Sequence, residues 1–270
     1  MAEAPGAARI AAAFAAAKAE QRAALMPYMM AGFPDPDAAL LIGRAYADAG
    51  ADLVEVGVPY SDPLADGPVI HAAATAALAA GATFEHALAS VAELGEGVPA
   101  VLMCYANMVL ALGPRRFAGR LAEAGGVGAI VPDLPLEESA EVLEALDEHG
   151  LALIPLVAPT TPPERRRRIS EAAGGFVYVV SDVGTTGERA SVPPGLAELV
   201  AAVKGESELP VAVGFGISSP EQAAEVGRVA DGVIIGSRLV RLAGEADSDE
   251  EAVDQIGGFL RLTRAALAGG

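Results

Sequence analysis

The chain has 270 residues, of which 52% are hydrophobic, and its 36 acidic and 18 basic residues give a net charge of −18. This charge argues against a protein that binds nucleic acids or anionic membranes, and no uninterrupted apolar run is long enough to span a bilayer. The single cysteine, Cys104, excludes an intramolecular disulfide and a cysteine-rich metal site, so we expect a cytoplasmic protein.

Apolar runs typical of strands alternate with helical segments along almost the whole chain. Residues 7–17 predict an N-terminal helix whose buried face carries Ile10 and Phe14. Strands are expected at residues 26–31, 52–56, 100–105, 127–131, 151–157, 176–180, 210–213 and 231–235. Helices are expected at residues 36–49, 69–80, 84–94, 114–124, 137–148, 162–173, 195–204, 220–229 and 249–263. Capping patterns place helix starts at Asp35, Thr161, Ser219 and Ser248.

Eight strands that are each followed by a helix predict a single (β/α)8 TIM barrel with an extra N-terminal helix. No linker or composition break divides the chain, so we expect residues 1–270 to form one domain. A doubly wound open sheet is the alternative. No G-x-G-x-x-G pattern opens a first strand–helix unit, which lowers the case for a dinucleotide-binding fold of that kind.

The expected strand at residues 52–56 carries a carboxylate among apolar neighbours. Alternation along the strand places Glu55 on the face opposite Val54 and Val56. The outer face of a barrel packs against helices, so Glu55 is expected to point into the barrel mouth, where barrel enzymes carry their catalytic groups. The proline-rich loop that follows holds two further acids, Asp62 and Asp66.

Aromatic side chains near the predicted strand ends are candidates for the wall of a substrate pocket. They are Tyr28, Tyr105, Tyr178 and Phe215. Packing inside the barrel is an equally good interpretation of each. The three histidines, His71, His86 and His149, fall in or at the ends of expected helices, so we assign no metal site.

Glycines after the last two predicted strands indicate a phosphate site. Gly216 follows the seventh strand, and Gly236 with Ser237 follows the eighth. Glycine lets backbone N–H groups approach an anion, and Ser237 is placed to begin a helix whose N-terminus binds phosphate. Tight turns without a ligand are the alternative. Because the net charge is strongly negative, such a site depends on local backbone donors.

Five stretches, in this order, closely resemble the tryptophan synthase alpha subunit family. They are residues 55–68 (EVGVPYSDPLADGP), 105–107 (YAN), 131–135 (VPDLP), 214–217 (GFGI) and 235–237 (IGS). The first stretch is highly specific, whereas the glycine turns alone are a weak signal. The likeness covers nearly the whole chain.

The resemblance implies a (β/α)8 barrel that cleaves indole-3-glycerol phosphate to indole and glyceraldehyde 3-phosphate in tryptophan biosynthesis. This is a retro-aldol reaction without a metal or cofactor in this chain. It implies a partner, the beta subunit, which contains PLP, in an α2β2 heterotetramer. The chemistry needs a carboxyl group that holds a proton near neutral pH, so an apolar setting is expected to raise its pKa.

Residue roles follow from the positions of the matching motifs. Glu55 matches the acid–base glutamate of the family and Asp66 its second catalytic aspartate. The residues expected to bind substrate are Tyr28, Tyr105, Tyr178, Thr186, Gly187, Phe215, Gly216, Gly236 and Ser237. Asp62 and Asn107 match residues on the side that faces the beta subunit.

The chain departs from the family pattern at four positions. Asp182 stands where the family usually has a basic residue and Thr185 where it has valine, so closure of this loop is expected to differ. His71 replaces a usual glutamine, and Tyr60 replaces a common phenylalanine. Two alternatives to the leading function are a stand-alone relative that releases indole and a catalytically inactive barrel that only regulates its partner. Intact Glu55 and Asp66 speak against the inactive barrel.

Overall fold

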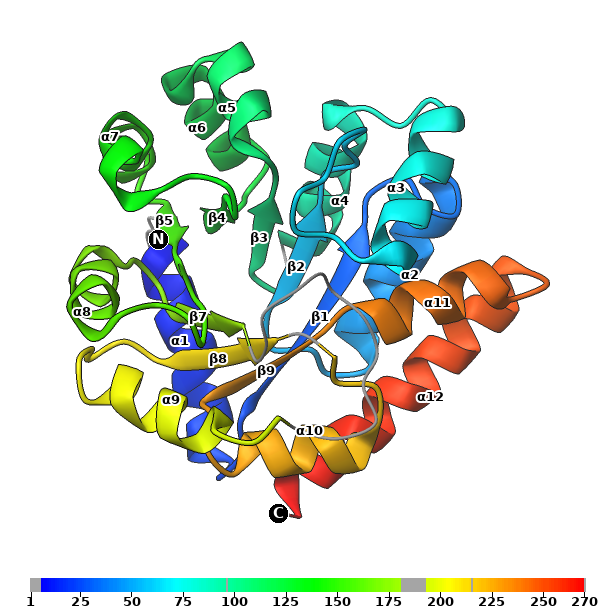
Figure 1. Cartoon of the computed structure of the whole chain (residues 1–270). Helices are drawn as coiled ribbons and strands as arrows, with labels where there is room; N and C mark the ends of the chain where they lie inside the picture. The colour runs from blue at the N-terminus through cyan, green and yellow to red at the C-terminus, as the bar shows by residue number, and fades with distance from the viewer. Residues whose placement is uncertain (1–5, 96, 181–192, 215, 270) are drawn as a thin grey trace.

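A ring of parallel strands surrounded by helices forms the body of the molecule (Figure 1). The computed structural model describes residues 6–95, 97–180, 193–214 and 216–269. The strands in these residues are β1 (Ala24–Met30), β2 (Val54–Gly57), β3 (Ala100–Met103), β4 (Gly128–Ile130), β5 (Ala152–Ile154), β6 (Leu156–Val157), β7 (Val177–Val180), β8 (Val211–Gly214) and β9 (Gly232–Ile235). The helices are α1 (Gly6–Ala19), α2 (Pro36–Asp48), α3 (Pro68–Ala79), α4 (Phe84–Gly95), α5 (Ala106–Leu112), α6 (Pro114–Glu123), α7 (Ala140–Glu148), α8 (Pro163–Ala172), α9 (Leu196–Lys204), α10 (Pro220–Gly227), α11 (Ser237–Glu245) and α12 (Asp249–Ala268), with a 3-10 turn, η1 (Leu136–Glu138).

The barrel closes through residues 152–157, where one expected strand is present as two short ones. β5 pairs with β4 and β6 pairs with β7, so these pieces lie at the two ends of the sheet order β5-β4-β3-β2-β1-β9-β8-β7-β6. Pro155 lies between them and has no N–H to donate to a ladder, which explains the break. With β5 and β6 counted as one strand, the described chain has eight parallel strands, and the predicted barrel is confirmed.

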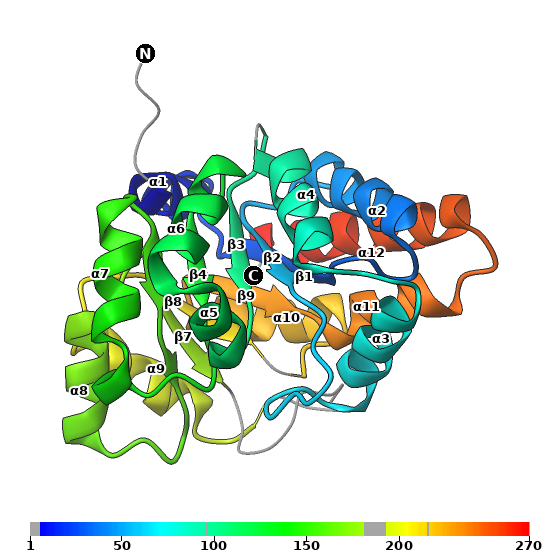
Figure 2. The ribbon, with the colours of Figure 1, turned by 90° about the horizontal axis from the view of Figure 1, so that it is seen from above.

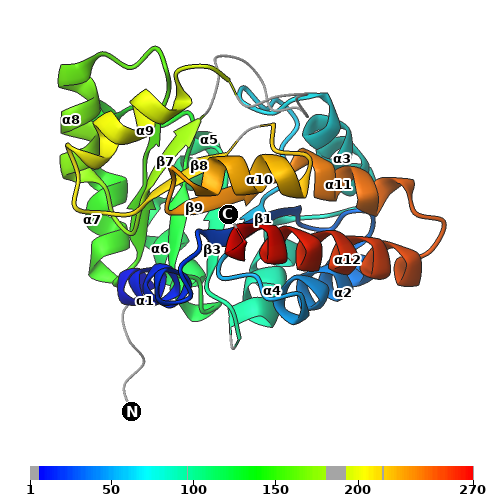
Figure 3. The ribbon, with the colours of Figure 1, turned by 90° about the horizontal axis from the view of Figure 1, so that it is seen from below.

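Side chains alternate between the inside and the outside of the barrel, as predicted. On β2, Val54 and Val56 belong to the apolar layer between barrel and helices, whereas the preceding Leu53 belongs to the cluster inside the barrel. This inner cluster includes Ile10 and Phe14 of α1. Figures 2 and 3 show α1 at the edge of the molecule where the strands begin, and the loop between β2 and α3 at the opposite edge. The extra helix therefore covers the end of the barrel away from that loop.

Local capping explains where several helices begin. Asp35 accepts hydrogen bonds from the N–H groups at the start of α2, and Ser219 and Ser248 do the same for α10 and α12, as predicted. The predicted cap at Thr161 is wrong, because its hydroxyl accepts a hydrogen bond from Ala158 N–H in the preceding turn.

Two helical segments differ from the sequence-based expectation. The stretch before Pro114, expected as a loop, contains α5, whose start is fixed by Asp133 Oδ1, the acceptor of the Ala106 N–H at 2.8 Å. The helix expected from residue 137 begins at Ala140, because η1 precedes it. In the part of the chain that the structure describes, no helix is both long and apolar enough to cross a membrane.

Candidate active site

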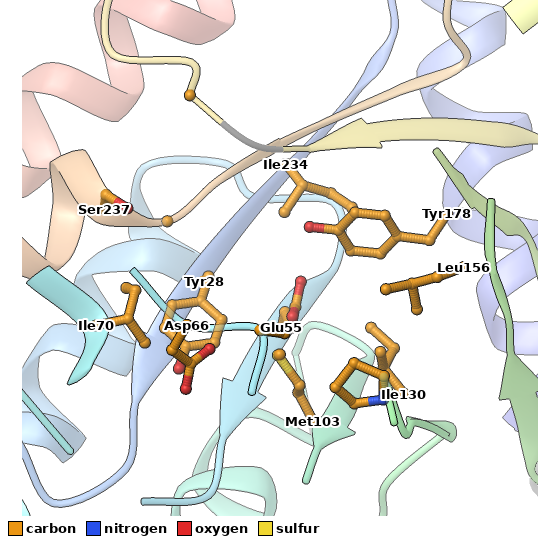
Figure 4. A pocket seen from close by; sticks show the side chains of 14 residues that line it. Tyr28, Glu55, Asp66, Ile70, Met103, Ile130, Leu156, Tyr178, Ile234 and Ser237 are labelled. Carbon is orange, nitrogen blue, oxygen red and sulfur yellow. The ribbon is translucent and has the colours of Figure 1, made fainter. Parts of the chain in front are cut away.

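The carboxyl ends of the strands surround a pocket that contains Glu55, as Figure 4 shows. Asp66 reaches this pocket from the loop after β2, Tyr28 from β1 and Tyr178 from β7. The empty space, including the part open to solvent, is about 560 Å³. Glu55 therefore lies in the barrel mouth, where alternation along its strand placed it.

Apolar side chains that the sequence reasoning did not single out form much of the wall. They are Ala65, Ile70, Met103, Ile130, Pro132, Leu156 and Ile234. Met103, Ile130 and Ile234 lie on β3, β4 and β9 and face the same interior as Glu55. The alternation used for Glu55 was a sufficient signal to find these three. Such a wall favours an apolar bound group.

Burial controls the protonation of Glu55. Its side chain is only 2% exposed, and Oε2 has no hydrogen-bond partner in the described residues. Burial, and secondly the negative charge of Asp66, raise the pKa of this carboxyl group to about 8. Glu55 therefore holds a proton at neutral pH, and it can donate one and take one back near that pH.

Asp66 is held differently, because it is half-buried and hydrogen-bonded. The Tyr105 hydroxyl donates to its carboxylate and accepts the Ala65 N–H at 3.1 Å. Partial burial raises the pKa of Asp66, while the bond from Tyr105 and the charge of His71 oppose that shift. Two carboxyl groups in different environments thus share one pocket, a pattern typical of divided acid–base roles.

The raised pKa of Glu55 predicts how stability depends on pH. Because the native state keeps the proton up to about pH 8 and the unfolded chain loses it near 4.5, the native state binds more protons in this window. This group therefore lowers the free energy of unfolding as pH rises through the window. We expect Glu55→Gln to abolish this fall in the free energy of unfolding. The difference in unfolding free energy between the variant and the wild type should therefore shift in favour of the variant from pH 5.5 to pH 8.5.

Urea unfolding at both pH values measures this difference. Glu250→Gln, at an exposed position on α12, is the matched control and should follow the wild type. If the free energy of unfolding changed equally with pH in the wild type and in Glu55→Gln, that result would contradict the raised pKa of Glu55.

The hydroxyl groups of Tyr28 and Tyr178 occupy space that two glycines leave open. A Cβ at Gly57 would collide with the Tyr28 hydroxyl, and a Cβ at Gly214 would collide with the Tyr178 hydroxyl. Both tyrosines are buried, and the pKa of each phenol lies well above its ordinary value, first because of burial and then because of the nearby carboxylates. Both hydroxyls are therefore neutral near Glu55.

Gly216, Gly236 and Ser237 all line the pocket. Gly216 has a φ of +88°, a conformation that glycine adopts readily. Ser237 is the first residue of α11, so the N–H groups that begin this helix lie at the pocket lining, where they can bind an anion. Five residues of the sequence-based predictions lie outside the described residues: Asp182, Thr185, Thr186, Gly187 and Phe215.

Asp62 and Asn107 do not line the pocket. Asp62 is exposed and accepts a hydrogen bond from Ser61 Oγ at 2.5 Å. Asn107 is exposed on α5, and its Nδ2 donates to the Tyr60 hydroxyl at 3.4 Å. The Tyr60 ring stacks on Tyr105 with centroids 5.1 Å apart, so this outer surface is in direct contact with a residue that holds Asp66.

The histidines lie where the sequence placed them. His71 is on α3, His86 is on α4 and His149 follows the last turn of α7. Within the described ranges, no group of three or more His, Cys, Asp or Glu side chains could hold a metal ion.

The fold and the pocket define a class of protein, a (β/α)8-barrel enzyme that carries its carboxyl groups and glycine turns at the mouth of the barrel. A family model described as "Tryptophan synthase alpha chain" matches residues 14–266. The chain belongs to the tryptophan synthase alpha chain family, and it is a lyase that cleaves indole-3-glycerol phosphate in tryptophan biosynthesis.

Individual relatives agree with the family model. The chain is 47% identical over 259 residues to the tryptophan synthase alpha chain of Roseiflexus castenholzii, covering 95% of this chain and 99% of the relative. It is 47% identical over 265 residues to that of Gloeobacter violaceus, with 96% and 94% covered. A structure of Mycobacterium tuberculosis tryptophan synthase superimposes with a TM-score of 0.90 at 41% identity, over 97% of this chain and 99% of that one. The alternative of an inactive, purely regulatory barrel finds no support in these relatives.

Proposed function

We propose that Glu55 and Asp66 carry out the retro-aldol cleavage of indole-3-glycerol phosphate. The observation that carries this assignment is the buried Glu55 carboxyl group, with Oε2 unpaired in the described residues and its pKa raised to about 8, beside Asp66 in an apolar pocket. A group in this state is a proton donor that becomes a base after one transfer.

The proton movements follow from this arrangement. Protonated Glu55 donates to the ring carbon that carries the glycerol chain, and the ring becomes a cation with its charge shared by the ring N–H. The carboxylate of Asp66 accepts the N–H hydrogen bond and stabilises that charge. The Glu55 carboxylate then takes the proton of the adjacent hydroxyl, the carbon–carbon bond breaks, and its electron pair returns to the ring. Indole and glyceraldehyde 3-phosphate result, and Glu55 has its proton again.

The substrate is held at both ends in this proposal. The apolar wall with Tyr28 and Tyr178 holds the indole ring. Tyr105 does not line the pocket; it holds Asp66 by a hydrogen bond and is assigned to substrate binding by its place in the family motif alone. Gly216, Gly236 and Ser237 hold the phosphate through backbone N–H groups. Thr186, Gly187 and Phe215 are assigned to substrate binding by their place in the family motifs alone. We propose that this chemistry needs no metal or cofactor in this chain.

Gly236→Val tests the phosphate position. The Cβ at residue 236 would lie in ordinary contact with Tyr28, so the added methyl groups would enter the pocket edge where the phosphate is placed. We expect the affinity for glycerol 3-phosphate to fall at least about tenfold, since one lost backbone contact to a charged group costs about 1.5–3 kcal/mol. Calorimetric titration measures it, with Gly258→Val on α12 as the control, because the space around Gly258 is open. Unchanged affinity in Gly236→Val would remove these residues from the phosphate site.

We further propose that a beta subunit, which holds the PLP, binds the side of the barrel that carries Asp62 and Asn107, in a cytoplasmic α2β2 assembly. Two large apolar side chains are exposed in the same segments, Leu64 at 77% beside Asp62 and Leu110 at 58% on α5. Exposed apolar groups flanked by polar ones are typical of a protein interface. Residues 1–270 would act in this assembly as a single domain.

An assay of indole formation, with and without a beta subunit, tests the function as a whole. Indole released by the chain alone, and faster with the partner, is the expected result. Release at one unchanged rate would favour a stand-alone enzyme. Absence of indole under both conditions would refute the assigned catalytic roles.

A further inference from the structure

Tyr28 brings a phenol hydroxyl into the wall of the catalytic pocket. It lies on β1 and is paired with Glu55 of β2 in the parallel register, so both side chains point to the same interior. A Cβ at Gly236 would lie 3.6 Å from the Tyr28 Cβ, whereas a Cβ at Gly57 would collide with the Tyr28 hydroxyl. The ring therefore leans from the glycine turn after β9 toward β2, and its hydroxyl fills the space that Gly57 leaves open.

The Tyr28 hydroxyl has no oxygen or nitrogen partner in the described residues. Its side chain is buried, with 6% of the residue exposed, and the hydroxyl contacts the thioether sulfur of Met30, a weak acceptor, at 4.0 Å. A buried hydroxyl without a partner costs free energy, which a bound molecule recovers if it supplies an acceptor. Indole offers a donor, its N–H, and no lone-pair acceptor. An indole ring that displaces water from this wall therefore leaves the Tyr28 donor unpaired.

This hydroxyl belongs to the side of the pocket that carries Asp66. Figure 4 shows Tyr28 and Asp66 on one side of Glu55 and Tyr178 on the other. After burial, the charge of Asp66 contributes most to the raised pKa of the Tyr28 phenol, whereas for Tyr178 the charge of Glu55 contributes more than that of Asp66. A donor and a carboxylate therefore lie next to each other in this part of the wall.

A ring that presents a donor and an acceptor on one edge would match this pair. The proposed function places the ring N–H at Asp66 and the reacting ring carbon at Glu55. Ring position 2 lies between these two atoms, so position 7, on the other side of the N–H, faces the Tyr28 hydroxyl. In indole position 7 is a C–H, whereas in 7-azaindole it is a nitrogen with a free lone pair. A site with a hydrogen-bonding group discriminates between ligands that do and do not pair with it.

We propose that Tyr28 determines the ring specificity of this site, and that the pocket takes 7-azaindoles, rings with an acceptor nitrogen next to the N–H, as ligands and as substrates of the reverse reaction. The inference rests on the proposed function, because it takes Asp66 as the acceptor of the ring N–H. In the reverse reaction the ring carbon bonds to the aldehyde carbon of glyceraldehyde 3-phosphate. Glu55 gives its proton to the aldehyde oxygen and takes the proton that leaves the ring carbon.

Equilibrium titrations of the full chain with indole and with 7-azaindole, followed by NMR, test the binding preference. The quantity compared is the Kd of indole divided by the Kd of 7-azaindole. We expect this ratio to fall by at least about threefold in Tyr28→Phe, the effect of one lost neutral hydrogen bond. Tyr28→Phe should also bind indole at least as tightly as the wild type does, since no unpaired hydroxyl remains.

Tyr178→Phe is the matched control, because it removes the other buried phenol that lines the pocket, on the side of Glu55. Its Kd ratio should equal that of the wild type. Condensation with glyceraldehyde 3-phosphate gives a second readout, the kcat/KM for 7-azaindole divided by that for indole. This ratio should fall by a similar factor in Tyr28→Phe alone, since the intrinsic reactivity of each ring is the same for every variant.

An unchanged Kd ratio in Tyr28→Phe, or equal falls in Tyr28→Phe and Tyr178→Phe, would overturn the role of Tyr28. No condensation of 7-azaindole by the wild type would overturn its place as a substrate. Ring binding requires no proton transfer, so a failure of the proposed function is recognised separately. It would appear as normal cleavage of indole-3-glycerol phosphate by Glu55→Gln, whatever the azaindole ratios are.

Discussion

Glu55→Gln is expected to lower turnover of indole-3-glycerol phosphate by at least about 10²-fold, the smaller end of the effect of a general acid–base group. Glutamine has nearly the same shape as a protonated glutamic acid, so the apolar pocket around residue 55 should keep its packing. What the variant loses is the acidic proton that Glu55 donates and takes back. Initial rates of indole release measure the effect.

Two further measurements separate chemistry from structure in this variant. Affinity for glycerol 3-phosphate should remain near that of the wild type, because Gly236 and Ser237 are unchanged. In the wild type, kcat/KM should fall as pH rises through about 8, since an ionised Glu55 cannot donate a proton. Turnover close to that of the wild type in Glu55→Gln would refute its role as the proton donor.

Asp66→Asn is the second large effect, with an expected loss of turnover of about 10²–10³-fold. The amide that replaces the carboxylate carries no charge, so the cationic ring formed after proton transfer loses its stabilising partner. The variant should also shift the pH at which activity declines to a lower value, because the charge of Asp66 contributes to the raised pKa of Glu55.

The same loop offers a control for Asp66→Asn. Asp62→Asn also removes one negative charge from the segment between β2 and α3, but Asp62 is exposed and does not line the pocket. We expect Asp62→Asn to keep the turnover of the isolated chain and its pH profile. A similar loss of turnover in both variants would mean that the net charge of the loop, and not the position of Asp66, determines activity.

The position of Glu55 shows what alternation can predict. A strand repeats every two residues, so the face of Glu55 follows from the apolar residues beside it, and the structure places it in the pocket as expected. The same rule applied to β3, β4 and β9 leads to Met103, Ile130 and Ile234. Caps at Asp35, Ser219 and Ser248 were predictable for the same reason, because each depends on residues within one helical turn.

Errors occurred where a distant segment provides the partner. The start of α5 depends on Asp133, 27 residues away in the chain, and a local pattern does not contain that hydrogen bond. The break between β5 and β6 falls at Pro155, which the sequence shows, but only the fold shows that the two pieces pair with different neighbours, β4 and β7. Thr161 had the right residue type for a cap, but its hydroxyl is occupied by Ala158 N–H.

The sequence by itself determined the alternation of strands and helices, the barrel class, the family and the face that carries Glu55, because all of these rest on local periodicity or on a specific motif. Only the tertiary structure decided the pKa of Glu55, since burial and the approach of Asp66 arise from packing between strands and a loop. Only the tertiary structure brought Pro132 and Leu156, from two different strand ends, into the wall of the catalytic pocket. Contacts between distant segments are set by the whole fold, and a local pattern does not encode them.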